Sequence, residues 1–300
     1  MAKGTTRGEA KRGEAPAISL VLPVFNGEAY LAQALESIFA QTFNDFELIA
    51  VDDCSTDRSP RILAEYASRH PQMRVLRNPR NAKLPASLNA GFRAARGQWF
   101  SWTSDDNLLE PGMLARLYDA ARTESADIVY SDFHLIDADG NPIERVRAGQ
   151  PQDLVIGNPV GCSFLYRRAV DERLGGYDER LFGVEDYDFW LRAYRAGLRF
   201  EVIHEPLYRY RRHGRSLTAT RAKQIHALSS PLKQAAIEEL PPSPSRAQAY
   251  IRLVTDDVYH FRWNLLARAL RDDPPTLLRH LGPIFAWLRF SVRKRLSRHS

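Results

Sequence analysis

The chain has 300 residues, of which 44% are hydrophobic and 26% charged, a composition that can bury a core as one large domain with an appendage. Its two cysteines, Cys54 and Cys162, lie far apart and show neither C-x-x-C nor Cys/His spacing, which excludes a zinc module or a disulfide framework and favours a reducing compartment. The net charge is +6, yet the sequence carries no nucleic-acid-binding motif, so we do not expect nucleic acid as a partner.

The N-terminal residues 1–16 are rich in Lys, Arg, Gly and Glu and lack the apolar core of a signal peptide, so they predict a disordered tail. No apolar run in the sequence reaches the roughly 20 residues that cross a bilayer. We therefore expect a cytoplasmic protein.

From Ile18 onward, short apolar runs alternate with segments of helical period, which predicts strand and helix units around a mostly parallel sheet of the α/β class. We expect strands over 18–24, 46–51, 73–76 and 99–103, with helices between them. Gly97 is expected to close the third of these helices, and Pro111 to open a helix after the fourth strand.

Beyond residue 127 the alternation weakens. We expect strands over 128–130 and 163–166, a hairpin turn at Asp139-Gly140, and a helix that begins with Glu185, Asp186 and Asp188. Pro241, Pro242 and Pro244 then predict a linker into a C-terminal helical region.

Paired carboxylates follow two of the predicted strands, with Asp52 and Asp53 after the second and Asp105 and Asp106 after the fourth. Ligands of open α/β sheets bind outside the carboxyl ends of the strands, and tandem carboxylates suit Mg²⁺ or Mn²⁺ shared with phosphate oxygens. A turn that caps the next helix would use the same residues, so either doublet alone is a weak signal. The segment Pro23 to Gly27 has neither G-x-G-x-x-G nor a Walker loop, which disfavours a dinucleotide-dependent dehydrogenase.

Five motifs follow one another along the chain, and together they identify a protein family more specifically than any one of them alone. They are LPVFNGEAYL, QTFNDFELIAVDDCSTD, NAKLPASLNAGFRAARGQWFSWTSDDN, GGYDERLFGVEDYDFWLR and YRYRRHGRSLT. Together these segments, from Ile18 to about Thr218, resemble the inverting family 2 glycosyltransferases. The resemblance implies the A-type glycosyltransferase fold, Rossmann-like, with a C-terminal helical extension. It divides the chain into a transferase domain at 17–220, with a nucleotide-binding half at 17–110 and an acceptor half at 111–220, and a helical region at 221–300.

The resemblance also implies roles for individual residues. It places Asp53 at the base edge, Asp105 at the ribose and Asp106 at the metal, while Asp186 becomes the general base and Glu185 faces the acceptor. The other residues expected around the nucleotide sugar are Pro23, Phe25, Asn26, Glu28, Lys83 and Arg212, and His213 is expected at the metal. Thr103-Ser104-Asp105-Asp106 departs from the Asp-x-Asp-Asp of many relatives, which leaves open how many aspartates touch metal. Lys83, Arg212 and His213 also fit a solvated surface, and the helix dipole alone would favour acids at the start of a helix.

The expected activity is therefore a Mn²⁺- or Mg²⁺-dependent transfer of sugar from a nucleotide-sugar donor, a UDP-sugar, to a hydroxyl on a saccharide or lipid-linked acceptor. Such a reaction belongs to cell-surface polysaccharide or glycolipid synthesis. A sugar nucleotidyltransferase would need a Gly- and Arg-rich phosphate loop, which is absent at Pro23 to Gly27. A non-catalytic sugar-nucleotide-binding or scaffold protein stays open.

The last predicted helix is strongly basic. Residues 284–298 hold five Lys and Arg residues and no acid, interleaved with apolar and aromatic residues. This pattern is typical of a helix that lies on an anionic membrane surface, here the inner face of the cell membrane. A terminal helix packed on the core with a solvated basic face has the same pattern.

Overall fold

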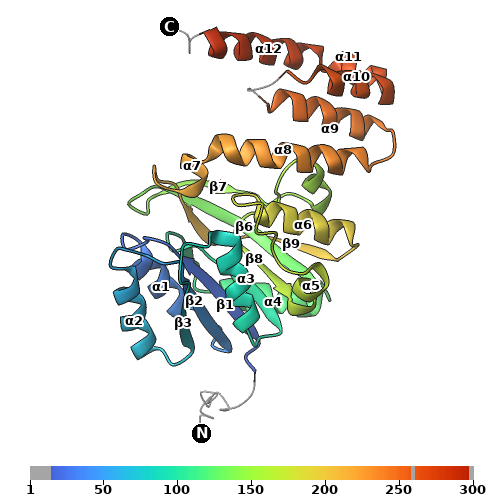
Figure 1. Ribbon diagram of the computed structural model, residues 1–300. Helices are drawn as coiled ribbons and strands as arrows, with labels where there is room; N and C mark the ends of the chain where they lie inside the picture. The colour runs from blue at the N-terminus through green and yellow to red at the C-terminus, as the bar shows by residue number, and fades with distance from the viewer. Residues whose placement is uncertain (1–14, 258–260, 297–300) are drawn as a thin grey trace. The chain divides into compact units, whose positions relative to one another are not determined.

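A computed structural model describes residues 15–257 and 261–296 of the chain (Figure 1). The predicted disordered tail lies outside the described residues except for its last two. The chain divides into two compact units. The first takes in the described residues up to Gly149, Val160–Phe182 and Arg195–His213; the second takes in Gln150–Pro159, Gly183–Tyr194 and the described residues from Gly214 onward.

The first unit is built on a mixed sheet, in which the described residues form nine strands in the order β3-β2-β1-β4-β8-β6-β9-β5, with β7 paired to β6. The first four in this order are mutually parallel, as predicted, and so are β6 and β9. The remaining pairs are antiparallel. The strands are β1 (Ile18–Val24), β2 (Phe46–Asp52), β3 (Met73–Arg77), β4 (Trp99–Trp102), β5 (Leu108–Leu109), β6 (Ile128–Ile136), β7 (Pro142–Val146), β8 (Phe164–Arg167) and β9 (Phe200–Arg211).

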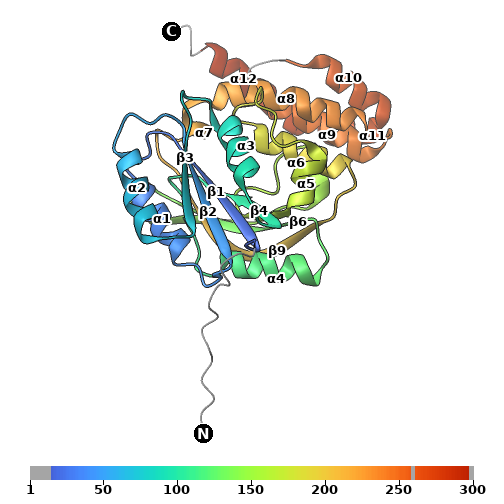
Figure 2. The ribbon, with the colours of Figure 1, turned by 60° about the horizontal axis from the view of Figure 1, so that its bottom comes forward.

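Helices cover both faces of this sheet, which explains why every residue of β1 and β2 is buried and why neither strand alternates polar with apolar. On one face α1 (Leu31–Phe39), α2 (Ser59–Arg69) and α4 (Met113–Thr123) pack in a single core with Ile18, Leu20 and Leu22. Figure 2 shows β1, β2 and β3 side by side, with α1 and α2 next to them. The predicted apolar positions Leu31, Leu35 and Ile38 are among those buried.

The other face is covered by α3 (Leu84–Ala94), and α5 (Arg168–Leu174) follows β8. A Cβ on Gly91 of α3 would lie 2.5 Å from Cγ1 of Val21, so this helix packs closely on β1. The expectation that Gly97 closes α3 is wrong, because the helix ends at Ala94. Gly97 instead runs against β1: its N–H donates to Oγ of Ser19 at 2.8 Å, and a Cβ there would lie 2.6 Å from the Ser19 nitrogen.

The predicted hairpin at Asp139-Gly140 is confirmed between β6 and β7, and Gly140 has a φ of +95°. β6 runs to Ile136, well past the predicted strand at 128–130, because β9 pairs with it over most of its length. This pairing brings the end of β9 beside the hairpin, which positions part of the site described below.

The second unit is helical. It holds the 3-10 helix η1 (Pro151–Val155), α6 (Glu185–Arg195), α7 (Leu217–Thr220), α8 (Ala222–Glu238), α9 (Pro244–Thr255), α10 (Trp263–Asp272), α11 (Pro274–Arg279) and α12 (Leu281–Leu296). Its apolar core joins Tyr250 and Val254 of α9 to Leu265 of α10 and Trp287 of α12, with Val155 packed against it. α9 lies between α8 and the last three helices (Figure 1). Among the described residues, no helix is long and apolar enough to span a membrane.

Candidate active site

The two carboxylate pairs lie at the carboxyl ends of β2 and β4, at the same edge of the sheet. β1 runs between β2 and β4, so the two pairs are separated by one strand. Pro23 lies within β1 and is buried; the residues after β1, from Phe25 to Glu28, therefore lie between the two pairs.

The turn after β1 is tied to the turn after β2 by side chains of both. Asn26, with a φ of +54°, donates its N–H to Oγ of Ser55 at 3.0 Å and accepts at Oδ1 from the Thr56 N–H at 2.8 Å. Glu28 accepts at Oε2 from the Arg58 N–H at 2.9 Å, and these hydrogen bonds from Arg58 lower the pKa of the Glu28 carboxyl. The Phe25 ring is 48% exposed and free of the core, which leaves it open to a ligand.

Asp53 is buried and organises the segment before α3. Its Oδ1 accepts from the Ala82 N–H at 2.7 Å, and its Oδ2 from the Lys83 N–H at 2.9 Å. Asn78 donates its side-chain amide to the same carboxylate at 2.8 Å. Lys83 is thereby held at a φ of +76° with its side chain exposed. The carboxylate predicted to read a base thus also shapes the loop that carries the predicted phosphate-facing lysine.

Asp105 lies against the turn after β1. Its Oδ2 accepts from the Phe25 N–H at 3.4 Å, and a Cβ on Gly27 would lie 2.1 Å from the same oxygen. Only glycine therefore fits at position 27 with Asp105 in this place. Burial, and then the charge of Asp106, raise the pKa of Asp105 to about 7.

Asp106 pairs with His213, which follows β9. Its Oδ2 lies 2.9 Å from Nε2 of His213, and the His213 ring stands 5.0 Å from the Tyr30 ring. Within the described part of the chain, Oδ1 of Asp106 and Nδ1 of His213 are buried and have no hydrogen-bond partner. One polar atom of each of these two good metal-ligating groups is thus left without a hydrogen bond. The structure brings the predicted metal residues together over 107 positions of sequence.

Arg211 is the residue at this site that sequence reasoning missed. Its guanidinium is almost fully buried, donates from Nε to the Asp106 carbonyl at 2.8 Å, and lies 4.6 Å from the centre of the Tyr30 ring. It also donates to the Ala138 carbonyl in the β6–β7 turn at 2.9 Å and to Oε1 of Gln33 in α1 at 2.9 Å. The predicted neighbour Arg212 is exposed, with only its N–H bonded to the Ile136 carbonyl among the contacts described. The Y-R-x-H pattern that ends at His213 is the feature of the sequence that could have indicated a role for Arg211.

Asp106 and His213 together offer ligand atoms that fit a divalent cation, provided that its remaining ligands come from the substrate. Among the described residues, no group of three or more His, Cys, Asp or Glu side chains could hold a metal ion by protein ligands alone. Mg²⁺ in particular is commonly bound by one or two carboxylates together with the phosphates of its substrate. A pair of protein ligands with unsatisfied atoms meets that requirement.

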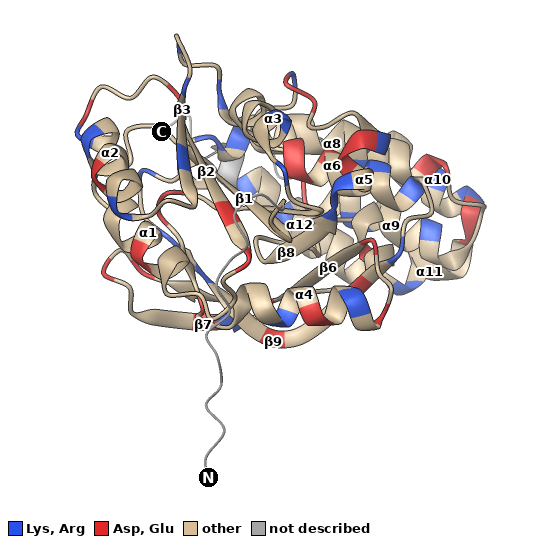
Figure 3. Ribbon diagram, turned by 90° about the horizontal axis from the view of Figure 1, so that it is seen from below, with Lys and Arg blue, Asp and Glu red and all other residues tan. Residues whose placement is uncertain are grey.

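In the second unit, α6 begins with three acidic residues, and this acidic first turn is visible as red ribbon in Figure 3. Burial and the charge of Asp186 raise the pKa of Glu185 to about 8, and burial raises the pKa of Asp186 to about 6. Asp186 is held by Asn158, whose side-chain amide donates to Oδ2 at 2.9 Å, and by the Tyr187 N–H at 2.7 Å to Oδ1. Asp188 pairs with Arg192 at 2.7 Å, one turn along the helix, which is a structural role.

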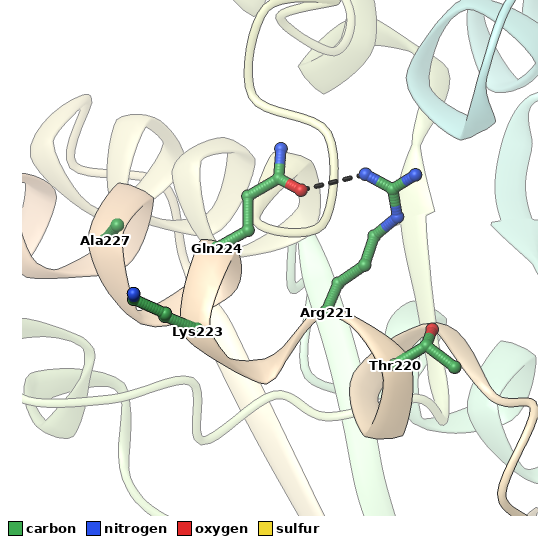
Figure 4. A pocket seen from close by; sticks show the side chains of 5 residues that line it. All are labelled: Thr220, Arg221, Lys223, Gln224 and Ala227. Carbon is green, nitrogen blue, oxygen red and sulfur yellow. Dashed lines mark hydrogen bonds between the residues drawn. The ribbon is translucent and has the colours of Figure 1, made fainter. Parts of the chain in front are cut away.

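A shallow hollow of about 680 Å³ lies at the start of α8 (Figure 4). It is lined by Thr220, Arg221, Lys223, Gln224 and Ala227, and Arg221 donates to Oε1 of Gln224 at 2.8 Å. None of the predicted site residues lines it.

The mixed sheet with helices on both faces is the architecture of the A-type glycosyltransferases, and the predicted fold class is confirmed. The sequence pattern of the family described as Glycosyl transferase family 2 matches residues 19–175 of the 300. The chain therefore belongs to glycosyl transferase family 2.

Relatives agree with this assignment. The uncharacterized glycosyltransferase EpsJ of Bacillus subtilis strain 168 is 30% identical over 223 residues, which are 68% of this chain and 63% of EpsJ. The uncharacterized glycosyltransferase RP339 of Rickettsia prowazekii strain Madrid E is 28% identical, over 70% of this chain and 68% of RP339. The chain thus spans less than two thirds of the length of EpsJ.

Two solved structures share the fold. S. aureus TarS residues 1–349, in complex with UDP, superposes with a TM-score of 0.61 at 19% identity over 79% of this chain and 69% of TarS. The mannosyltransferase PcManGT from Pyrobaculum calidifontis, in complex with GDP-Man and Mn²⁺, gives a TM-score of 0.63 at 18% identity over 95% of this chain and 81% of its own.

Proposed function

We propose that this enzyme is an inverting glycosyltransferase that uses Mn²⁺ or Mg²⁺ and a nucleotide-sugar donor. The observation that carries the proposal is the pairing of Asp106 with His213, each with an unsatisfied buried polar atom among the described contacts. A divalent cation held there, when bound, would neutralise the charge that develops on the leaving diphosphate.

The residues around this pair have distinct tasks in the proposal. The exposed Phe25 ring and the turn fixed by Asn26 and Glu28 would contact the base, with Asp53 at the base edge as the family resemblance implies. Asp105 would accept a hydrogen bond from the ribose, and exposed Lys83 and Arg212 would pair with phosphate oxygens. Arg211 would keep the backbone at Asp106 in place.

Asp186 is proposed as the general base that removes the proton of the acceptor hydroxyl as the hydroxyl oxygen attacks the anomeric carbon. Its pKa of about 6 suits a base that works near neutral pH. Asn158 donates to one carboxylate oxygen and so orients the group. Burial and the charge of Asp186 raise the pKa of Glu185, and we assign this carboxyl to the acceptor side.

For the donor we propose a UDP-sugar. TarS has been solved with UDP and with UDP-GlcNAc, and PcManGT with GDP-Man, so the fold accommodates both bases in other proteins. The acceptor is proposed to be a hydroxyl on a saccharide or a lipid-linked saccharide, in cell-surface polysaccharide or glycolipid synthesis at the inner face of the cell membrane.

Calorimetric binding of UDP and GDP, with and without Mn²⁺, tests the donor site. We expect one nucleotide to bind tightly only with Mn²⁺, and Asp106→Asn to weaken that binding at least about tenfold, or ~1.4 kcal/mol. Asp119→Asn, an exposed carboxylate of α4, is the matched control and should bind like the wild type. Metal-independent binding of equal strength in the wild type and Asp106→Asn would overturn the metal assignment.

A further inference from the structure

The last two helices expose an unusual amount of apolar surface. Leu278 at the end of α11 is 63% exposed, and Phe285 and Val292 of α12 are 57% and 42% exposed. Leu281, which begins α12, is 38% exposed. Large contiguous apolar surface on a folded protein marks a binding site for a partner or a membrane.

These residues are distinct from those that hold α12 in the core of the second unit. Ile284, Trp287 and Ser291, spaced by three and four residues, are buried, and the Trp287 indole N–H donates to the Asp257 carbonyl at 3.2 Å. With 3.6 residues per turn, Leu281, Phe285 and Val292 fall on a second stripe of the same helix. The helix is therefore packed through one face and exposes an apolar stripe along another.

Basic residues accompany this stripe. Arg289 and Arg293 are exposed and fall beside it on the helix, and Arg279 is exposed next to Leu278. In the part of the chain that the structure describes, neither Arg289 nor Arg293 forms an ion pair. Residues 274–300 contain six Lys and Arg residues and no Asp or Glu. The stripe is thus bordered by positive charge that no acid of this segment offsets.

We propose that the α12 stripe of Leu281, Phe285 and Val292, with Leu278 of α11 and with Arg289 and Arg293 beside it, docks onto the surface of an anionic lipid bilayer. An apolar stripe bordered by arginines is the arrangement with which an interfacial helix inserts among acyl chains and pairs with acidic headgroups. A nucleic acid would be held by the arginines but would leave Phe285 and Val292 in water. Because α12 already packs in the core of its unit through Ile284 and Trp287, docking needs no unfolding of the unit.

This inference rests on the proposed function only for the purpose of docking, which would be to keep the enzyme beside a lipid-linked acceptor. Lipid binding itself requires neither donor nor metal. Vesicle binding and nucleotide binding can therefore fail independently, and each is measured on the same preparations.

Flotation of the full chain with phosphatidylcholine vesicles, with and without phosphatidylglycerol, tests the proposal. We expect flotation only with the anionic lipid, and less of it at high salt. The double substitution Phe285→Ser with Val292→Ser should weaken vesicle binding at least about tenfold, and Arg289→Gln with Arg293→Gln should abolish the preference for anionic lipid. Ile143→Ser, which removes a 52% exposed apolar residue of β7, is the matched control and should float like the wild type.

Thermal melting and nucleotide binding verify that each variant is folded. Because Arg289 and Arg293 are exposed, their double variant keeps the test valid even if the apolar variant does not fold. The proposal is overturned if the wild type does not float, if it floats equally on neutral vesicles, or if folded variants float as the wild type does.

Discussion

Two adjacent carboxyls at the start of α6, Glu185 and Asp186, both have raised pKa values because both are buried. Glu185 is buried and lies next to the charge of Asp186, which lifts its pKa to about 8. Burial raises the pKa of Asp186 to about 6, while the hydrogen bonds from the Tyr187 N–H and from Asn158 favour its ionised form and oppose that rise. Burial thus raises the pKa of both carboxyls toward neutral pH, which suits a pair that exchanges protons with a substrate.

If Asp186 is the base, transfer must depend on its ionisation. A base with a raised pKa of about 6 is active above that pH and becomes protonated below it, so kcat should fall about tenfold per pH unit below pH 6 and level off above it. Asp186→Asn should lower kcat about 10²- to 10⁴-fold with donor affinity unchanged, whereas Asp188→Asn should retain most activity. Intact transfer by Asp186→Asn would remove it from the mechanism.

At the scale of elements, the connection from α3 to β4 fixes how the parallel strands begin. Arg96 donates its N–H to Glu47 of β2 at 2.7 Å, and Gly97 donates to Ser19 of β1, whose hydroxyl in turn donates to Glu47 at 2.7 Å. The hydrogen bonds from Ser19 and Arg96, together with the Arg74 charge, hold the pKa of the buried Glu47 below its usual range despite burial. One turn thus joins β1, β2 and β4 at their amino ends, opposite the edge that carries the site.

Gly97→Ala should weaken this junction, because its Cβ would meet the Ser19 backbone, which cannot move without shifting β1. We expect a loss of about 1–3 kcal/mol in the free energy of unfolding, measured by urea denaturation. Gly112→Ala is the control: the nearest atom to its Cβ would be 3.9 Å away, and its stability should change by less than about 0.5 kcal/mol. Equal effects of the two substitutions would show that the close approach at Gly97 does not matter.

At the scale of the whole chain, the second unit is assembled from three separate segments. Val155 and Ile156 pack against the core of the C-terminal helices, and a Cβ on Gly183 would lie 3.0 Å from Cγ1 of Ile225 in α8. The segment that carries Asn158 therefore shares a core with residues beyond 214, and the segment that carries Asp186 approaches them at Gly183. The predicted boundary at residue 220 stays a prediction, but these contacts argue that the C-terminal helices support the proposed base.

A chain shortened to residues 1–213 tests this dependence. Without α8 and α9, the apolar side chains of η1 lose their partners, at a cost of about 2–4 kcal/mol. Hydrogen exchange should then accelerate in η1 and α6 while β1 and β2 keep their protection. Unchanged protection of α6 in the shortened chain would mean that the C-terminal helices do not support it.

Much of the fold could be predicted from the sequence because local pattern determines it. The uniform apolarity of Ile18–Val24 indicates a strand buried on both faces, and the helical spacing of Leu31, Leu35 and Ile38 indicates the face that α1 buries. The two carboxylate pairs can be recognised from the sequence because the strands before them are easy to predict. The family, with its ordered motifs, follows from the same local information.

Other features depend on contacts between residues far apart in sequence. In the sequence, Arg211 is one more arginine of a basic segment. Its partners follow from the pairing of β9 with β6, which places the Arg211 guanidinium between Asp106, Ala138 and Gln33. Asn158 gains its role only when its loop meets Asp186. The period of α12 allowed either a packed or a membrane-facing helix, and only tertiary packing separated the buried Ile284 and Trp287 from the exposed Phe285 and Val292. The strands, the helices and the family could be inferred from local spacing along the chain. The partners of the buried polar groups and the face of α12 left to solvent could not, because burial is a property of the assembled chain.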